Sequence, residues 1–176
     1  MKIEYPRYHQ EIVKDLMDGK FILYPGKLYK SIAENEDFFM GFFENSFGYE
    51  LQIEQDYIYL ISTETDENTS RDIMIFFSIL SFEIDKSGNN FIDGLKYTIF
   101  DIATINDFFE NSSWVEIIKS NKQLNNDESR RKLIKLMAKR NIIEKINDDK
   151  FQFTNAHKVF IDFARELVNN GSNTHD

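Results

Sequence analysis

The sequence predicts a mainly helical protein with small β-hairpin wings, an α+β fold built from two units with the same order of elements. Apolar residues recur at helical spacing along most of the 176 residues. Two segments, at 49–61 and 142–153, instead alternate apolar and polar residues around a polar turn. Each hairpin follows a run of helices, once within residues 5–63 and once within 70–168. Three helices followed by a hairpin make a winged helix, so we predict tandem winged-helix domains.

The elements of the first unit follow one another with short breaks. A helix is predicted at residues 6–18, with Gly19 as its natural stop. A short extended segment ends in a Pro-Gly turn, and a short helix follows at residues 28–35. A helix rich in phenylalanine, 36–47, starts with two acids, which favour a helix N-terminus. The hairpin at 49–61 then completes the unit.

A polar stretch divides the two units. Residues 64–70, ETDENTS, contain no apolar side chain and are typical of a solvated linker. We therefore expect an N-terminal winged-helix domain at 1–63 and a linker at 64–69. A C-terminal winged-helix domain with an added C-terminal helix is expected at 70–176.

The helix predicted at residues 70–84 is apolar nearly all round. Such a helix is buried on two sides, which predicts one face against its own domain and another against the first domain or a second subunit. The residues expected at this dimer or interdomain interface are Ile73, Phe76, Phe77 and Leu80.

Residues 91–109 allow two interpretations. Phe91, Leu95 and Ile99 keep a helical stripe, whereas Ile102 and Ile105 fit either a helix or a short extended segment. A short helix within SSWVEIIKS and a polar loop then lead to the last part of the chain.

A basic helix is predicted at residues 127–140, with Asp127 as its N-cap. At 100° per residue, Leu133, Ile134 and Met137 point toward the core. The opposite side is rich in lysine, which suits contact with phosphates rather than with base edges. The residues expected to contact DNA are Arg131, Lys132, Lys135, Lys139 and Arg140.

The basic helix is an exception in an acidic chain. The net charge is −9 and the isoelectric point is about 4.9, yet residues 127–140 hold six basic and two acidic side chains. A protein that binds nucleic acid tightly on its own usually has a broad basic face. We therefore expect any DNA contact to be one patch within a larger assembly.

Residue types that carry chemistry do not form recognisable motifs. The chain has no cysteine, and its three histidines have no partner at metal-ligand spacing. Residues 85–96 resemble a calcium loop, but the sixth position is Asn90 and the twelfth is Lys96, so we reject a calcium site. Phosphate-binding glycine loops and nucleophile elbows are absent. We predict a protein that is no enzyme and has no cofactor.

The compartment follows from two further observations. The first ten residues have no apolar run and do not look like a secretory signal. The longest nearly apolar stretch, 73–82, is shorter than the about 20 residues that span a bilayer. We expect a cytoplasmic protein without membrane contact.

Two stretches resemble the MukE/MksE family, the winged-helix, kleisin-interacting subunits of bacterial SMC-type condensins. The first is KLYKSIAENEDFFMGFFENSFGYELQIEQDYIYLIS, residues 27–62. The second is RRKLIKLMAKRNIIEKINDDKFQFTNAHKVFIDFA, residues 130–164. The length fits MksE, or the JetC-type subunit of plasmid-defence condensins, better than MukE.

The resemblance implies partners. It implies a homodimer that binds a kleisin subunit (MksF- or MukF-like) and, through it, an SMC ATPase (MksB- or MukB-like), with non-specific DNA contact in the nucleoid. By position, Arg131, Lys135 and Lys139 match the DNA-contacting helix, with Lys132 and Arg140 nearby. Two alternatives remain: a dimeric winged-helix transcriptional regulator, and a structural interaction module whose basic helix is only a solvated face.

Overall fold

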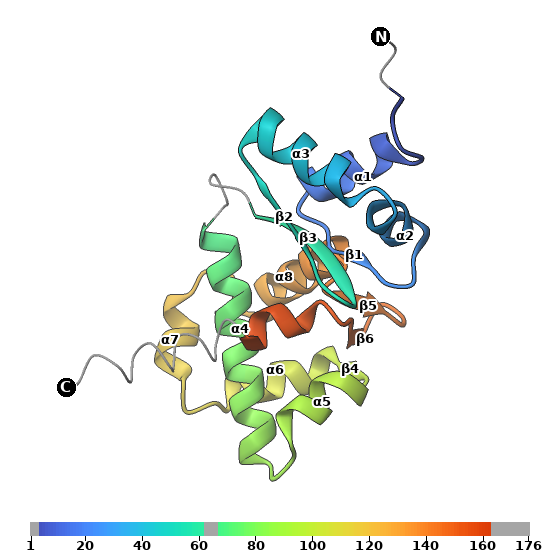
Figure 1. The fold of residues 1–176 in the computed structure, drawn as a ribbon. Helices are drawn as coiled ribbons and strands as arrows, with labels where there is room; N and C mark the ends of the chain where they lie inside the picture. Colours follow the sequence, from blue (N-terminus) through green and yellow to red (C-terminus); the bar gives the residue numbers. More distant parts are fainter. Residues whose placement is uncertain (1–3, 62–66, 163–176) are drawn as a thin grey trace, which may run out of the picture. The chain divides into compact units, whose positions relative to one another are not determined.

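The chain folds into helices and two small antiparallel sheets, which confirms the predicted α+β class (Figure 1). The computed structural model describes residues 4–61 and 67–162. The chain divides into two compact units. One unit is Met1–Thr65 with Lys139–Asn141, and the other is Asp66–Ala138 with Ile142–Asp176.

The first unit contains the elements predicted for it, and the extended segment before the Pro-Gly turn forms the short strand β1 (Ile22–Leu23). Its helices and strands are α1 (His9–Met17), β1 (Ile22–Leu23), α2 (Lys27–Ala33), α3 (Glu36–Phe47), β2 (Glu50–Ile53) and β3 (Tyr57–Ile61). Gly48 ends α3 in the left-handed conformation, at φ 69°, and its N–H donates to the carbonyl of Glu44. A residue with a Cβ would be strained there, which explains glycine at this point.

The sheet of the first unit has the strand order β1-β3-β2. The hairpin register places Glu50 opposite Ile61 and Ile53 opposite Ile58. The two residues of β1 pair with the same strand on its other side, Ile22 opposite Ile58. The core beneath the sheet joins all three helices to the strands; its members are Ile12, Leu16, Ile22, Ile32, Phe39, Phe43, Leu51 and Ile58.

The second unit is longer and begins with one long helix. Its elements are α4 (Glu67–Lys86), α5 (Phe91–Tyr97), β4 (Phe100–Asp101), α6 (Ile102–Glu110), α7 (Val115–Ser120), α8 (Asp127–Lys139), β5 (Ile143–Lys145) and β6 (Lys150–Phe153). A further helix starts at His157 and continues to Asp162, where the described residues end. The sequence pattern also predicts Phe163 and Leu167 on the core face of this last helix, and both lie outside the described residues.

Two boundaries differ from the sequence-based expectation. The helix α4 begins at Glu67 and so includes residues 67–69, which were expected to belong to the linker. The single helical stripe expected through Ile99 is interrupted, and this side chain is 54% exposed. The interruption arises because β4 pairs with β6, after which the Asp101 carboxylate caps α6 by accepting a hydrogen bond from Ala103 N at 2.8 Å.

Both units repeat one topology. In each, a two-residue strand follows a helix, further helices come next, and a hairpin follows them; in the second unit the helix that starts at His157 comes after the hairpin. The short strand pairs with the second strand of the hairpin in both cases, giving the orders β1-β3-β2 and β4-β6-β5. The two units therefore share their strand pairing as well as the order of their elements.

The apolar helix α4 lies in the core of its own unit, next to α5 and α6 in Figure 1. Its buried residues include the four expected at an interface, each with an exposed fraction of 5% or less: Ile73, Phe76, Phe77 and Leu80. The ring of Phe77 stacks on that of Phe160, with centroids 4.8 Å apart. These contacts leave the four side chains little surface for a second subunit, and their role in an interface stays a prediction.

A charge at the centre of this core should unfold the second unit. The ring of Phe76 is fully buried and lies 5.1 Å from the ring of Phe109. We expect Phe76→Asp to destabilise the protein by about 4 kcal/mol or more, because a carboxylate would be buried without a partner. Thermal unfolding followed by circular dichroism measures the loss. Ser78→Asp, on the exposed side of the same helix, is the control and should melt close to the wild type.

A buried histidine starts the last described helix. His157 is 3% exposed, and its Nδ1 lies 2.6 Å from the carbonyl oxygen of Thr154. A backbone carbonyl only accepts hydrogen bonds, so Nδ1 carries the proton of the neutral ring. Burial lowers the pKa of His157, and the nearby Lys158 and Lys96 act in the same direction, while the Thr154 carbonyl and Asp162 oppose the shift.

Stability should fall at mildly acidic pH because of this histidine. A lowered pKa in the folded state means that the unfolded chain binds the proton more readily, so the stabilisation is complete above about pH 6.5 and is lost as the pH falls through the folded pKa. We expect His157→Asn, whose amide N–H can replace Nδ1–H as donor, to lose less stability than the wild type between about pH 7.5 and about pH 5.5. Urea unfolding at the two pH values measures this; equal losses in both proteins would contradict it.

Candidate nucleic-acid interface on helix α8

The candidate interface is built on α8, whose first turn is fixed by polar side chains. Asp127, predicted as the N-cap, is instead the first helical residue. The capping oxygen belongs to Asn126, whose Oδ1 accepts a hydrogen bond from Ser129 N at 2.9 Å. The Asp127 carboxylate can therefore contact other side chains. Its negative charge also stabilises the helix, because it lies near the positive N-terminal end of the helix dipole.

The apolar side of α8 is as predicted. Leu133, Ile134 and Met137 have exposed fractions of 2%, 1% and 0%. Their burial fixes which side of the helix is left for solvent, since residues three and four apart share a face. Arg131, Lys135 and Lys139 follow one another at intervals of four residues and so lie along one side of the helix.

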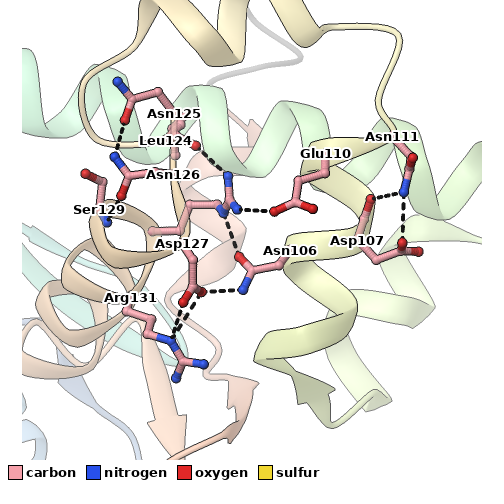
Figure 2. Close-up of polar contacts among 11 residues, drawn as sticks. Asn106, Asp107, Glu110, Asn111, Leu124, Asn125, Asn126, Asp127, Ser129 and Arg131 are labelled. Carbon is pink, nitrogen blue, oxygen red and sulfur yellow. Dashed lines mark hydrogen bonds and ion pairs between the residues drawn. The ribbon is translucent and has the colours of Figure 1, made fainter.

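Arg130 does not belong to the basic surface. Its side chain is 2% exposed, although the sequence pattern counted it among the basic residues of this helix. It donates hydrogen bonds from Nε to Asn106 Oδ1 at 2.6 Å, from Nη1 to the carbonyl of Leu124 at 2.9 Å and from Nη2 to Glu110 Oε1 at 3.1 Å. In Figure 2, dashed lines from the labelled Asn106, Glu110 and Leu124 meet at one side chain that the figure leaves unlabelled.

The contacts of Arg130 offset the cost of burying its charge. Burial lowers the pKa of Arg130, and the carboxylates of Glu110 and Asp127 act in the opposite direction. The group remains protonated at any ordinary pH, because the guanidinium starts from so high a pKa. Its three acceptors come from α6 and from the loop before α8, so the charge holds these segments together.

Arg131 is exposed but already paired. Its Nε donates to Asp127 Oδ2 at 3.0 Å, and its Nη1 donates to Asp149 Oδ1, in the turn between β5 and β6, at 3.2 Å. The hydrogen bonds to Asp127 and then to Asp149 raise the pKa of Arg131. The pKa of Asp127 is lowered, first by a hydrogen bond from Asn106 and second by the one from Arg131.

The other predicted DNA-contact residues differ in how accessible their charges are. Lys132 forms an exposed ion pair with Glu128 at 2.7 Å, and this lowers the pKa of Glu128. Lys135 and Lys139 are exposed and have no ion-pair partner among the residues that the structure describes. Arg140 lies just beyond the end of α8, is half-buried, and belongs to the three-residue segment that clusters with the first unit.

The structure thus brings four of the five predicted DNA-contact residues onto one helix, and two of these, Lys135 and Lys139, form no ion pair with any residue it describes. It also adds Asp149, which sequence analysis did not connect with the helix. Within residues 4–61 and 67–162, no group of three or more His, Cys, Asp or Glu side chains is placed to hold a metal ion. None of the helices in these ranges is long and apolar enough to cross a membrane.

A comparison with known families defines the class of the protein. The family model described as "Condensin complex protein MksE" matches residues 7–165, which is most of the chain. The chain therefore is a condensin-type accessory protein, and it belongs to the MksE family. This confirms the resemblance to MukE and MksE found in the sequence. None of the curated proteins matches the chain significantly.

Removing the buried guanidinium should be far more costly than removing the exposed one next to it. We expect Arg130→Met to destabilise the protein by about 2–4 kcal/mol, because the buried Leu124 carbonyl and the partly buried Asn106 Oδ1 would lose their donor. Arg131→Gln removes the same charge from the surface and should leave the melting temperature nearly unchanged. Chemical unfolding of the two variants compares them, and similar stabilities would contradict the structural role of Arg130.

Proposed function

We propose that this chain is a non-catalytic subunit of a bacterial condensin-like SMC complex that binds a kleisin and contributes non-specific DNA contact. The kleisin is of the MksF or MukF type and links the chain to an SMC ATPase of the MksB or MukB type. Membership of the MksE family carries the proposal. The site of action is the nucleoid in the cytoplasm, in chromosome organisation and segregation or in plasmid defence.

Each unit is proposed to be a winged-helix domain, at residues 1–63 and 70–176 as the sequence predicts, with the predicted linker 64–69 shortened by α4, which begins at Glu67. The support is the topology that both units repeat, with a short strand paired to the second strand of the closing hairpin. In this arrangement α3 and α8 take equivalent places, each directly before its hairpin. Of these two helices, α8 carries the basic residues, whereas α3 carries acids and phenylalanines.

The DNA contact is proposed for the exposed side of α8, with Lys135 and Lys139 as the accessible cations and with Arg131, Lys132 and Arg140 beside them. Lysine ammonium groups interact with phosphate as point charges and carry no base preference. Two accessible cations in a protein of net charge −9 predict weak binding to free DNA. The contact gains importance when partners already hold the duplex against this helix.

A winged-helix transcriptional regulator is the less favoured hypothesis. Such a protein needs donors early in the recognition helix that can reach base edges. Arg130 is buried, and Arg131 is paired with two carboxylates. No base-reading arginine is then available in the first turn without a rearrangement, whereas phosphate contact needs none at Lys135 and Lys139.

A homodimer is also proposed, as the family resemblance implies. If α4 takes part, its exposed side has to provide the contact, because Ile73, Phe76, Phe77 and Leu80 are buried in the core of their own unit. Phe82 is 39% exposed on this helix, and its ring meets that of Trp114, which is 44% exposed. The four buried residues would then hold α4 in position through core packing, without contacting the second subunit.

The proposal is tested by assembling the chain with its kleisin and SMC partners. We expect Lys135→Gln with Lys139→Gln to leave assembly intact, as judged by size-exclusion chromatography, and to weaken DNA binding by the complex about threefold to tenfold at moderate salt, with a shallower dependence on salt. Removing two phosphate contacts lowers counterion release, which is the physical reason for both effects.

The matched control is Lys119→Gln with Lys122→Gln, which removes the same charge from exposed positions elsewhere in the second unit. DNA affinity should fall clearly less in this control. Failure of the wild-type chain to bind a kleisin would refute the assembly role. Equal affinity of the Lys135/Lys139 variant and the wild type would refute the DNA-contact role.

A further inference from the structure

The guanidinium of Arg131 lies between two carboxylates that come from different elements. Asp127 is in the first turn of α8, and Asp149 is in the turn of the β5–β6 hairpin. Two negative charges around one positive charge leave this corner of the helix with no excess of positive charge. A phosphate that approaches it meets a repulsive field unless one carboxylate moves away.

The two carboxylates are held to different degrees. Asp127 accepts a hydrogen bond from Asn106, and Asn106 is itself held by the buried Arg130, as Figure 2 shows for the labelled Asn106 and Asp127. This chain of contacts keeps Asp127 in place. The side chain of Asp149 is 67% exposed, and within the part of the chain that the structure describes its ion pair is with Arg131 alone.

The backbone of Asp149 is fixed independently of its side chain. Its carbonyl accepts a hydrogen bond from Ile102 N at 2.9 Å, and its N–H donates to Asn147 Oδ1 at 2.9 Å. The carboxylate can therefore leave Arg131 by a side-chain rotation, without unfolding of the hairpin. Exposed ion pairs are weak and exchange with solvent ions, so nothing in the geometry locks this pair.

We infer that Asp149 is an internal competitor of DNA phosphate: it occupies Arg131 in the free protein and gives it up when a phosphate is held against α8. The inference rests on the proposed DNA contact of this helix and adds its regulation. Arg131 thus becomes a phosphate contact beside Lys135 and Lys139 only when a DNA phosphate replaces the Asp149 carboxylate. The pairing with Asp149 weakens binding of the free chain to DNA. When partners hold a duplex against α8, Arg131 becomes the third cation in contact with it.

The test is Asp149→Asn in the full chain, measured by fluorescence anisotropy with a short DNA duplex of mixed sequence at low salt. The amide keeps the shape of the side chain and removes its charge. We expect affinity to rise by about twofold to fivefold, in line with the strength of exposed ion pairs. In the background of Arg131→Gln, the same substitution should give a much smaller gain, because the competitor no longer has a cation to release.

The neighbouring residue supplies a matched control. Asp148 is on the same turn, its side chain is fully exposed, and it pairs with Lys145 at 3.5 Å instead of Arg131. Asp148→Asn makes the same change in net charge and should raise affinity clearly less than Asp149→Asn. Equal gains would show a general charge effect and would overturn the inference, as would the absence of any gain in Asp149→Asn or an undiminished gain in the Arg131→Gln background.

These outcomes separate the inference from the proposed function. If Asp149→Asn gives no specific gain but the Lys135/Lys139 variant still weakens binding by the complex, only the exchange at Arg131 is refuted. If the Lys135/Lys139 variant binds as well as the wild type, the DNA contact of α8 itself is refuted.

Discussion

The buried charge of Arg130 is the interaction on which the candidate interface depends. A guanidinium removed from water is tolerated only where acceptors surround it, and here they come from Asn106 and Glu110 on α6 and from the carbonyl of Leu124. The arginine therefore determines where α8 begins relative to α6. Asn106 in turn donates a hydrogen bond to the exposed Asp127 carboxylate and so fixes its position. On the same helix Arg130 is buried among its acceptors, whereas Arg131 lies at the surface and pairs with two carboxylates.

The sequence predicted α8 and its core well, because the period of apolar residues reports burial directly. Leu133, Ile134 and Met137 face inward for this reason. It could not predict the burial of Arg130, since the partners lie 24 and 20 positions earlier and no local pattern encodes their approach. Arg130 lies three residues before Leu133 and four before Ile134, so helical spacing places it on the same face as the core, yet arginine at such a position ordinarily extends its charge to solvent. The signal would have been an Asn and a Glu four apart on an amphipathic helix, which is too common to be useful alone.

The short strands show a similar limit. Both β1 and β4 have two residues, so neither can display the alternation from which strands are predicted. Their existence depends on pairing with the distant strands β3 and β6. The β4 strand explains why the helical stripe from Phe91 does not continue through Ile99. The hairpins themselves were predictable, because each is formed by neighbouring segments with strong alternation and a polar turn.

The charge distribution of this chain, acidic overall with one small and partly neutralised basic helix, suits a subunit that works within an assembly. Independent DNA binding needs many phosphate contacts, since each releases counterions and adds to affinity. A subunit held by partners gains from proximity instead, because the local concentration of DNA replaces intrinsic affinity. Excess positive charge would then be a disadvantage, as it would bind free DNA without the partners. In the proposed function, Arg131 and Lys132 are paired with carboxylates, whereas Lys135 and Lys139 have no ion-pair partner in the described part of the chain, so the proposed DNA contact is weak until partners hold a duplex beside it.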